Sequence, residues 1–210
     1  MGPYENAPRL PEGTALRPGL LLEGAECVEL EIGPGRGWFM IERLGAVPQV
    51  GMIGLEIRRK WATIVDERLR VRGYGRRGRV FAEDAGAALS RFEPATLAAA
   101  FIHFPDPWWK KRHQKRRVVT RALLQELARV IRAGGELFMQ TDVAERALDF
   151  EELVESVPEF EPWQPSGPRV DENPYQARSP RERRAIEDGL PVVRLRYRRR
   201  SVEDQTAEPV

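Results

Sequence analysis

Several features that define particular classes of protein are scarce or missing in this sequence. Among 210 residues there is a single cysteine, Cys27, which excludes an intramolecular disulfide and a cysteine-based metal site. Nothing about the two histidines, His103 and His113, suggests a metal site either. No apolar run approaches the length of a membrane span, and no signal-peptide pattern opens the sequence. We therefore expect a cytoplasmic protein with no bound metal and no membrane association.

Lysine is also scarce, and its few positions are informative. It occurs only at positions 60, 110, 111 and 115, so arginine carries most of the positive charge. The net charge is only +2, yet the basic residues form two clusters: Lys110, Lys111, Arg112, Lys115, Arg116 and Arg117, and then Arg194, Arg196, Arg198, Arg199 and Arg200. Acidic residues gather instead between positions 142 and 161. This uneven distribution favours a polyanionic partner.

The length and a hydrophobic content of 41% are sufficient for one domain with a full core. Residues 1–24 are rich in proline and glycine without apolar periodicity, so we expect a loosely ordered arm. Residues 25–200 form the expected domain, and 201–210 a tail. Within the domain, residues 162–191 are rich in proline and have no clear period. They are either a functional loop, which would contact the substrate, or a partly disordered segment.

The order of apolar and amphipathic segments predicts an α/β fold. Strands are expected at 27–32, 50–57, 79–82, 97–104, 136–140 and 192–198. Helices are expected at 38–44, 58–71, 121–132 and 143–157, the third of them ended by Gly134-Gly135. This alternation implies right-handed crossovers and a mainly parallel, doubly wound sheet with helices on both faces. The last strand alternates apolar and basic residues, which indicates an antiparallel edge strand.

A glycine-rich loop follows the first expected strand. Gly33, Gly35 and Gly37 have the spacing G-x-G-x-G, whereas the dinucleotide fingerprint requires glycine at the position of Trp38. This spacing counts weakly against a nicotinamide-dependent dehydrogenase. Glycines at a strand end let a nucleotide-like ligand approach the backbone, although such a loop is often only a tight turn between strand and helix.

Acidic residues stand near the ends of three expected strands: Glu31, Glu56 and Asp84. Ligands of open parallel sheets bind at this edge. The Glu56 carboxylate could accept hydrogen bonds from both ribose hydroxyls, and Asp84 could accept one from the exocyclic amine of adenine. Each acid alone is more often a solvated loop residue. Together with the glycine loop they resemble the class I S-adenosylmethionine-dependent methyltransferases, in which one acid contacts the methionyl end and another holds the ribose.

The fourth expected strand runs into Phe104-Pro105-Asp106-Pro107-Trp108, and the first basic cluster follows directly. Prolines on both sides of Asp106 fix its backbone and prevent a helix from starting there. A rigid turn packed on Trp108 would explain the prolines and the tryptophan. It would not explain a carboxylate at a strand end beside so many cations.

Four motifs in order resemble the bacterial tRNA (guanine-N7)-methyltransferases: Glu31-Ile32-Gly33-x-Gly35, Gly54-x-Glu56, Phe104-Pro105-Asp106-Pro107-Trp108 with the basic cluster, and Gly134-Gly135 followed by Thr141-Asp142. The resemblance covers about residues 27–197. It implies a Rossmann-like methyltransferase domain that uses S-adenosyl-L-methionine to modify N7 of guanine 46 in the variable loop of tRNA. By motif position, the cofactor-binding residues would be Glu31, Gly33, Glu56, Asp84 and Asp106, with Asp106 also catalytic. The substrate would be contacted by Lys110 and Asp142.

The sequence departs from this family near its end. The family's Thr-x-Phe/Tyr-Glu is replaced by Asn173-Pro174-Tyr175-Gln176, which keeps the aromatic ring but exchanges a carboxylate for an amide. We expect this segment to contact the substrate. Tyr175 or Trp108 could stack on a guanine drawn from its tertiary stack, and core packing is an equal alternative for Trp108.

Methylation at N7 makes the purine cationic, so a carboxylate near the N1 and N2 edge would stabilise the growing charge. Asp106 is the first candidate for this role and Asp142 is the rival.

Two other functions are compatible with the same motifs. One is methyl transfer to a nitrogen of another RNA, a protein or a small molecule, because Asp106-Pro107-Trp108 partly imitates the Asn/Asp-Pro-Pro-Tyr turn of such enzymes. The basic cluster counts against small molecules. The other is a non-catalytic tRNA-binding subunit, which the acids at three strand ends argue against. We expect tRNA as the partner and a monomer or weak homodimer.

Overall fold

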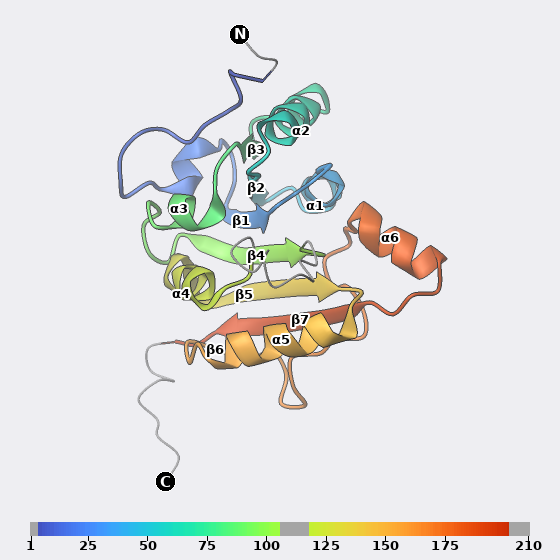
Figure 1. The fold of residues 1–210 in the computed structure, drawn as a ribbon. Coiled ribbons are helices and arrows are strands. Elements are labelled where there is room, and N and C mark those ends of the chain that lie inside the picture. Colours follow the sequence, from blue (N-terminus) through green and yellow to red (C-terminus); the bar gives the residue numbers. More distant parts are fainter. Residues whose placement is uncertain (1–3, 106–117, 202–210) are drawn as a thin grey trace.

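A computed structural model of the chain describes residues 4–105 and 118–201. Its centre is one sheet with the strand order β3-β2-β1-β4-β5-β7-β6 (Figure 1). The strands are β1 (Cys27–Ile32), β2 (Val50–Leu55), β3 (Gly78–Phe81), β4 (Leu97–His103), β5 (Ile131–Thr141), β6 (Phe160–Pro162) and β7 (Val193–Arg199). Strands β1 to β5 pair in parallel, and β7 pairs antiparallel with both β5 and β6. The predicted mainly parallel, doubly wound sheet is confirmed, with the short β6 outside the antiparallel β7.

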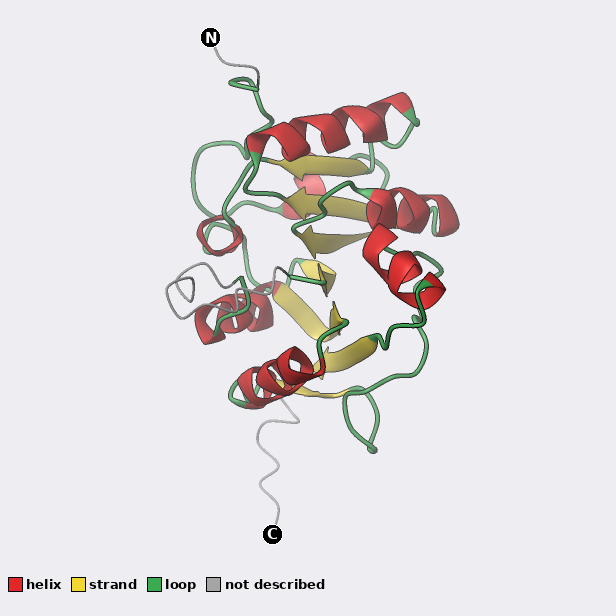
Figure 2. Ribbon diagram, turned by 45° about the vertical axis from the view of Figure 1, so that its right-hand side comes forward, coloured by secondary structure: helices red, strands yellow, loops and turns green. Residues whose placement is uncertain are grey.

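Helices cover both faces of the sheet, as Figure 2 shows. They are η1 (Pro18–Leu21), α1 (Trp38–Ala46), α2 (Arg59–Val71), α3 (Ala85–Leu89), α4 (Arg121–Val130), α5 (Ala144–Glu155) and α6 (Pro180–Glu187). One apolar cluster joins α3, α4 and α5 to the sheet, and a second joins α1 and α2 to the opposite face. Because side chains alternate along a strand, a single strand such as β1 serves both clusters.

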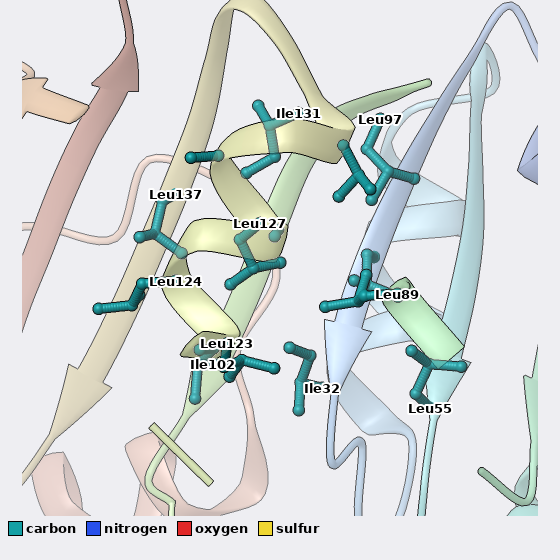
Figure 3. Packing of buried hydrophobic residues seen from close by; sticks show 14 of the residues in the cluster. Ile32, Leu55, Leu89, Leu97, Ile102, Leu123, Leu124, Leu127, Ile131 and Leu137 are labelled. Atoms are coloured by element: carbon teal, nitrogen blue, oxygen red, sulfur yellow. The ribbon is translucent and has the colours of Figure 1, made fainter. Parts of the chain in front are cut away.

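Helix α4 illustrates how the sequence builds one of these layers. The Thr120 side chain accepts a hydrogen bond from the Leu123 backbone N–H at 3.2 Å and so caps the helix. Leu124 and Leu127 are fully buried, and Figure 3 shows them packed between the helix and the sheet. Complete burial of a leucine side chain contributes about 1.5–3 kcal/mol. The helix therefore holds its place through its apolar face.

The end of α4 differs from the expectation. The helix ends at Val130, and the chain enters β5 at Ile131, so Gly134 and Gly135 lie within a strand and do not terminate the helix. A Cβ on Gly135 would stand 2.7 Å from the Ala98 carbonyl oxygen, and the pairing of β4 with β5 shifts register here. The two glycines allow close approach at a strand irregularity.

Residues 4–24, which we expected to form a loosely ordered arm, pack against the domain. Leu10 and Leu22 are 5% and 7% exposed and belong to the core cluster. The backbone N–H of Ala82 donates to the Pro8 carbonyl at 2.7 Å. Two buried leucines and backbone hydrogen bonds thus hold this segment in place. Its sequence has no helical or strand periodicity, so its packing could not be predicted.

The segment 162–191 contains the unpredicted helix α6, which lies beyond the end of β4 in Figure 1. Ser179 caps it by accepting a hydrogen bond from the Glu182 N–H at 3.1 Å, and Pro180 occupies the first turn. The residues that α6 buries are Glu182 and Ala185. An apolar stripe is absent, so hydrophobic periodicity could not indicate this helix.

Candidate functional site

The parallel strands end at one edge of the sheet, here called the carboxyl edge, and the glycine loop lies on it. Gly33, Gly35 and Gly37 have φ values of 67°, 55° and 74°, a region that side chains disfavour. A Cβ on Gly37 would stand 2.2 Å from Cγ1 of Val65 in α2, whereas a Cβ on Gly33 would meet nothing within 4 Å. Gly37 therefore permits helix packing, and Gly33 leaves open space beside β1.

Glu31 lies next to this loop, at the end of β1, and is 2% exposed. Its Oε1 atom is 2.9 Å from Nδ1 of His103 at the end of β4. Its Oε2 atom is buried and has no hydrogen-bond partner among the described residues. Half of this buried carboxylate is thus free to accept a hydrogen bond from a ligand.

Glu56 directly follows β2 and is 2% exposed. Within the described part of the chain, its side-chain partners belong to Arg58, whose backbone N–H, Nε and NH2 groups donate at 3.0, 2.9 and 3.1 Å. The Arg58 side chain is 58% exposed. A well-fixed carboxylate is therefore covered by a cation that extends into solvent.

Asp84, after β3, is exposed and caps α3 by accepting a hydrogen bond from the Ala87 N–H at 3.0 Å. Its neighbour Glu83 accepts a hydrogen bond from the Leu10 N–H at 3.1 Å. The carboxyl edge of β1, β2 and β3 therefore carries three carboxylates in a row, at Glu31, Glu56 and Asp84.

Strand β4 ends in a strained turn. Phe104 has a φ of 46°, which bulky residues rarely adopt, and its N–H donates to the Gln140 carbonyl at 2.8 Å. Strain of this kind is found preferentially at ligand sites and turns that the surrounding structure fixes. The residues that follow, including the candidates Asp106, Trp108 and Lys110 and the first basic cluster, lie outside the described residues.

Asp142 follows β5 on the same edge, and its side chain is 11% exposed. It forms an ion pair with Arg181 of α6, whose side chain is 55% exposed. The Glu42 carboxylate of α1 pairs with Arg183, also of α6. These two pairs seat α6 across the carboxyl edge between α1 and β5. No pattern in the sequence predicted this contact.

The Asn173 side chain shapes the segment that precedes α6. Its Oδ1 atom accepts a hydrogen bond from the Tyr175 N–H at 3.0 Å, and its Nδ2 group donates to Glu182 at 2.8 Å. Pro174 and Gln176 are exposed on either side of Tyr175. The amide at position 173 therefore ties this turn to α6.

Tyr175 itself is an anchor in the core. Its ring is 4% exposed and packs edge-on against Phe101 and Phe138, with centroids 4.8 and 4.9 Å away. Its hydroxyl donates to Glu136 at 2.5 Å, and Arg196 donates to the same carboxylate at 2.8 Å. Burial raises the pKa of the Tyr175 hydroxyl, and the charge of Glu136 adds to the effect. The ring presents no face on which a base could stack.

The predicted residues thus fall into two groups at the carboxyl edge. Glu31, Gly33, Glu56 and Asp84 lie along β1 to β3, while Asp142 and the 173–176 turn lie by β5 and α6. Sequence reasoning missed two polar contributors, His103 and Gln140. The alternation of β4 and β5 would place them on the face that carries Glu31, but pairings between distant strands are not legible in a single sequence.

Two kinds of feature are absent from the described residues, 4–105 and 118–201. They contain no group of His, Cys, Asp and Glu side chains arranged to hold a metal ion. None of their helices has both the length and the apolar character needed to cross a bilayer.

Known sequences similar to this chain share most of its length. The model of a family described as "Putative methyltransferase" matches residues 25–195. A tRNA (guanine-N(7)-)-methyltransferase of Myxococcus xanthus is 38% identical over 170 residues, covering 80% of this chain and 82% of that protein. A protein of the same name from Rhodopirellula baltica is 34% identical over 181 residues, covering 83% of this chain. The match spans 66% of the Rhodopirellula protein, slightly less than two thirds of its length.

Solved structures show the same fold at low identity. The aminoglycoside resistance methyltransferase NpmB1 has a TM-score of 0.56 and 15% identity, over 89% of this chain and 95% of that chain. The antibiotic-resistance methyltransferase Kmr has a TM-score of 0.58 and 18% identity, over 91% of this chain and 98% of that chain. These likenesses concern the fold alone.

Proposed function

Because the chain belongs to the family of tRNA (guanine-N7)-methyltransferases, we propose that it transfers a methyl group from S-adenosylmethionine to N7 of a guanine in tRNA. The observation that carries this proposal is the carboxyl edge beside β1 and β2, where an open glycine loop meets two buried carboxylates, Glu31 and Glu56. This is the switch point of a doubly wound sheet, with β1 between β2 and β4. Within tRNA, we propose guanine 46 of the variable loop as the target.

The described residues fit the cofactor. The space beside Gly33 accepts a ligand close to the backbone. The Oε2 atom of Glu31, which has no partner in the described part of the chain, suits the ammonium group of the methionyl end. Glu56 would accept hydrogen bonds from the ribose hydroxyls, with the exposed Arg58 side chain moving aside. Asp84, at the neighbouring strand end, would accept a hydrogen bond from the adenine amine. Bound in this way, S-adenosylmethionine supplies a methyl group on a sulfonium centre.

On the substrate side we propose contacts from Asp142, Lys110 and the 173–176 turn. Asn173, Pro174 and Gln176 would form the contact surface of this turn, with Tyr175 anchoring it from below. Arg181 holds the Asp142 carboxylate in the free protein and would exchange that contact for a tRNA phosphate. The basic cluster at 110–117 would bind the RNA backbone without sequence preference.

Methylation at N7 does not require a general base at the attacking atom. N7 of guanine has a lone pair in the ring plane and needs no prior proton removal. The protein must therefore position the base and stabilise the positive charge that develops on the purine. We assign this charge stabilisation to Asp106, which is also a candidate for cofactor contact, with Asp142 as the second carboxylate.

The direct test is nucleoside analysis of tRNA incubated with the protein and S-adenosylmethionine labelled in its methyl group. The expected result is label in 7-methylguanosine, mapped to position 46 by fragment sequencing. Label in another nucleoside would overturn the N7 assignment, and label in 7-methylguanosine elsewhere would overturn only the position.

The roles of the two acids can be separated by Asp106→Asn and Asp142→Asn. With saturating tRNA and cofactor, we expect Asp106→Asn to lower kcat by about a hundredfold or more, the scale of a lost electrostatic contact to the transition state. Asp142→Asn should raise KM for tRNA with a smaller change in kcat. An unchanged kcat in Asp106→Asn, or the reverse pattern, would contradict the assignment.

A further inference from the structure

Three polar side chains form a buried row across the central strands, near the carboxyl edge. Glu31 lies in β1, His103 in β4 and Gln140 in β5. His103 pairs with Gln140 in register, and Glu31 pairs with Phe101, two residues before His103. Alternation therefore places all three side chains on one face of the sheet. The side chains of Glu31 and His103 are each 3% exposed, and Gln140 is 1% exposed.

Among these three side chains, the described structure has one hydrogen bond. Glu31 and His103 share a single hydrogen bond of 2.9 Å. Four buried atoms have no partner among the described residues: Glu31 Oε2, His103 Nε2, Gln140 Oε1 and Gln140 Nε2. Buried polar atoms nearly always have partners, and one without a partner costs free energy. A cluster of such atoms, one of them on Glu31 two residues before the open space at Gly33, points to a ligand.

The donor and acceptor pattern specifies what the ligand must offer. A carboxylate oxygen accepts hydrogen bonds, so Nδ1 of His103 donates in its contact with Glu31. Among the free atoms, Oε2 of Glu31 and Oε1 of Gln140 are acceptors, and Nε2 of Gln140 is an amide donor. An ammonium group has three donors and no acceptor. It is the complementary group, and the methionyl end of the proposed cofactor carries one.

We infer that His103 is a positioning residue that holds Glu31 in place for the ammonium group of the methionyl end. This inference rests on the proposed function. The imidazole ring is fixed by Phe39, Phe101 and Phe138, whose centroids are 4.2, 5.9 and 6.1 Å away. A ring packed on three aromatic neighbours keeps its plane, and its Nδ1–H keeps one Glu31 oxygen occupied. The second oxygen then has a single orientation toward the ligand.

The test compares two ligands that differ only at the relevant end. S-adenosylhomocysteine carries the amino-acid portion, and 5′-methylthioadenosine lacks it. Calorimetry would measure both ligands on wild type, His103→Phe and His103→Asn. The Phe variant removes the Nδ1 donor, whereas the Asn variant supplies an amide donor at nearly the same place. Thermal unfolding without ligand would show that each variant is folded.

We expect His103→Phe to bind S-adenosylhomocysteine at least about tenfold more weakly, with methylthioadenosine affinity changed less than about twofold. His103→Asn should retain the wild-type preference. Equal losses for both ligands, or full S-adenosylhomocysteine affinity in the Phe variant, would overturn the inference. If the Phe variant does not fold, His103→Gln replaces it, and equal affinities of the Gln and Asn variants would overturn the inference. A wild-type protein that binds neither ligand would refute the proposed function itself.

Discussion

Carboxylates at the carboxyl edge of β1 and β2 are paired differently from those in the half of the sheet that carries α6. At that edge, Glu31 keeps one oxygen without a partner among the described residues, and the described partners of the Glu56 side chain belong to the exposed Arg58. In the half formed by β5, β7 and β6 with α6, Glu136 and Glu182 each bind an arginine and a further side chain. Fully satisfied charge networks fix structure, whereas partly satisfied groups remain available to a ligand. The carboxyl edge of β1 and β2 therefore has a carboxylate oxygen available to a ligand, whereas this second half of the sheet builds its own framework.

The largest effect is expected for Glu182→Gln, which tests whether the paired carboxylates around α6 stabilise the fold. Glu182 is fully buried and accepts hydrogen bonds from Arg194 at 3.1 Å and Asn173 at 2.8 Å. The change keeps the side-chain volume but leaves the Arg194 guanidinium, 10% exposed, without a counter-charge. We expect a loss of about 3–5 kcal/mol in the free energy of unfolding, measured by chemical denaturation.

Asp188→Asn is the matched control, because Asp188, directly after α6, pairs with Arg184 of that helix and both side chains are exposed, 49% and 73%. It should cost no more than about 0.5 kcal/mol. Similar losses for both variants would mean that burial does not distinguish these ion pairs.

The glycine loop contains both a residue required for packing, Gly37, and a residue beside open space, Gly33. Gly37→Ala would force a side chain into Val65 at a positive φ, and we expect it to lower the free energy of unfolding by about 2–4 kcal/mol. Gly33→Ala has the strain of positive φ but no clash, so it should cost about 1–2 kcal/mol. Thermal unfolding would compare the two. A larger loss of stability for Gly33→Ala than for Gly37→Ala would contradict the assignment of Gly37 to helix packing and of Gly33 to ligand space.

How far the sequence could predict these features depended on local pattern. Strand β1 has the predicted bounds, and the glycine loop after it was also predicted. Both features are specified by residues that are consecutive in the sequence. The missed elements α3, β6 and α6 are short or bury few apolar residues. In α6 the central buried side chain is the carboxylate of Glu182, which a hydrophobic period cannot reveal.

The site was predictable to a similar degree. The acids at the ends of β1, β2 and β3 could be placed because a parallel sheet aligns its strand ends. Their partners could not be predicted. The Glu31–His103 contact joins residues 72 positions apart, and the Asp142–Arg181 pair depends on a helix that had not been predicted. Such pairings arise from strand order and helix docking, which one sequence does not encode locally.

Two carboxylates on the same face of β1 allow the contrast to be tested on ligand affinity. Glu29 is saturated by Arg43, whose Nε and NH2 groups donate at 2.9 and 2.6 Å, whereas one oxygen of Glu31 has no partner among residues 4–105 and 118–201. Burial alone would lower the pKa of Arg43, but its hydrogen bond with Glu29 and the charge of that carboxylate raise it. Glu31→Gln should weaken S-adenosylhomocysteine binding by about tenfold, measured by calorimetry.

Glu29→Gln is the control for this prediction. It should lower the free energy of unfolding by about 3 kcal/mol or more and leave the affinity of the folded protein nearly unchanged. If Glu29→Gln weakens binding as much as Glu31→Gln, the two carboxylates do not differ in function.

The smallest effect concerns two buried tyrosines in the second half. The Tyr175 hydroxyl donates to Glu136 at 2.5 Å, whereas the Tyr197 hydroxyl is buried without a partner among the described residues. Tyr175→Phe should cost about 1 kcal/mol in the free energy of unfolding, because Glu136 loses one donor and keeps Arg196. Tyr197→Phe should be neutral or slightly stabilising, because it removes an unsatisfied hydroxyl.

The pH dependence of unfolding gives this pair a second readout. Burial raises the pKa of both tyrosines above the ordinary value of about 10, and neighbouring carboxylates add to the effect. Above that pH the unfolded chain loses these protons while the folded protein keeps them, so stability falls as the pH rises. Each Phe variant should therefore show a shallower decline above pH ~10 than wild type. An unchanged slope in both variants would mean that neither hydroxyl is held in its neutral form by the fold.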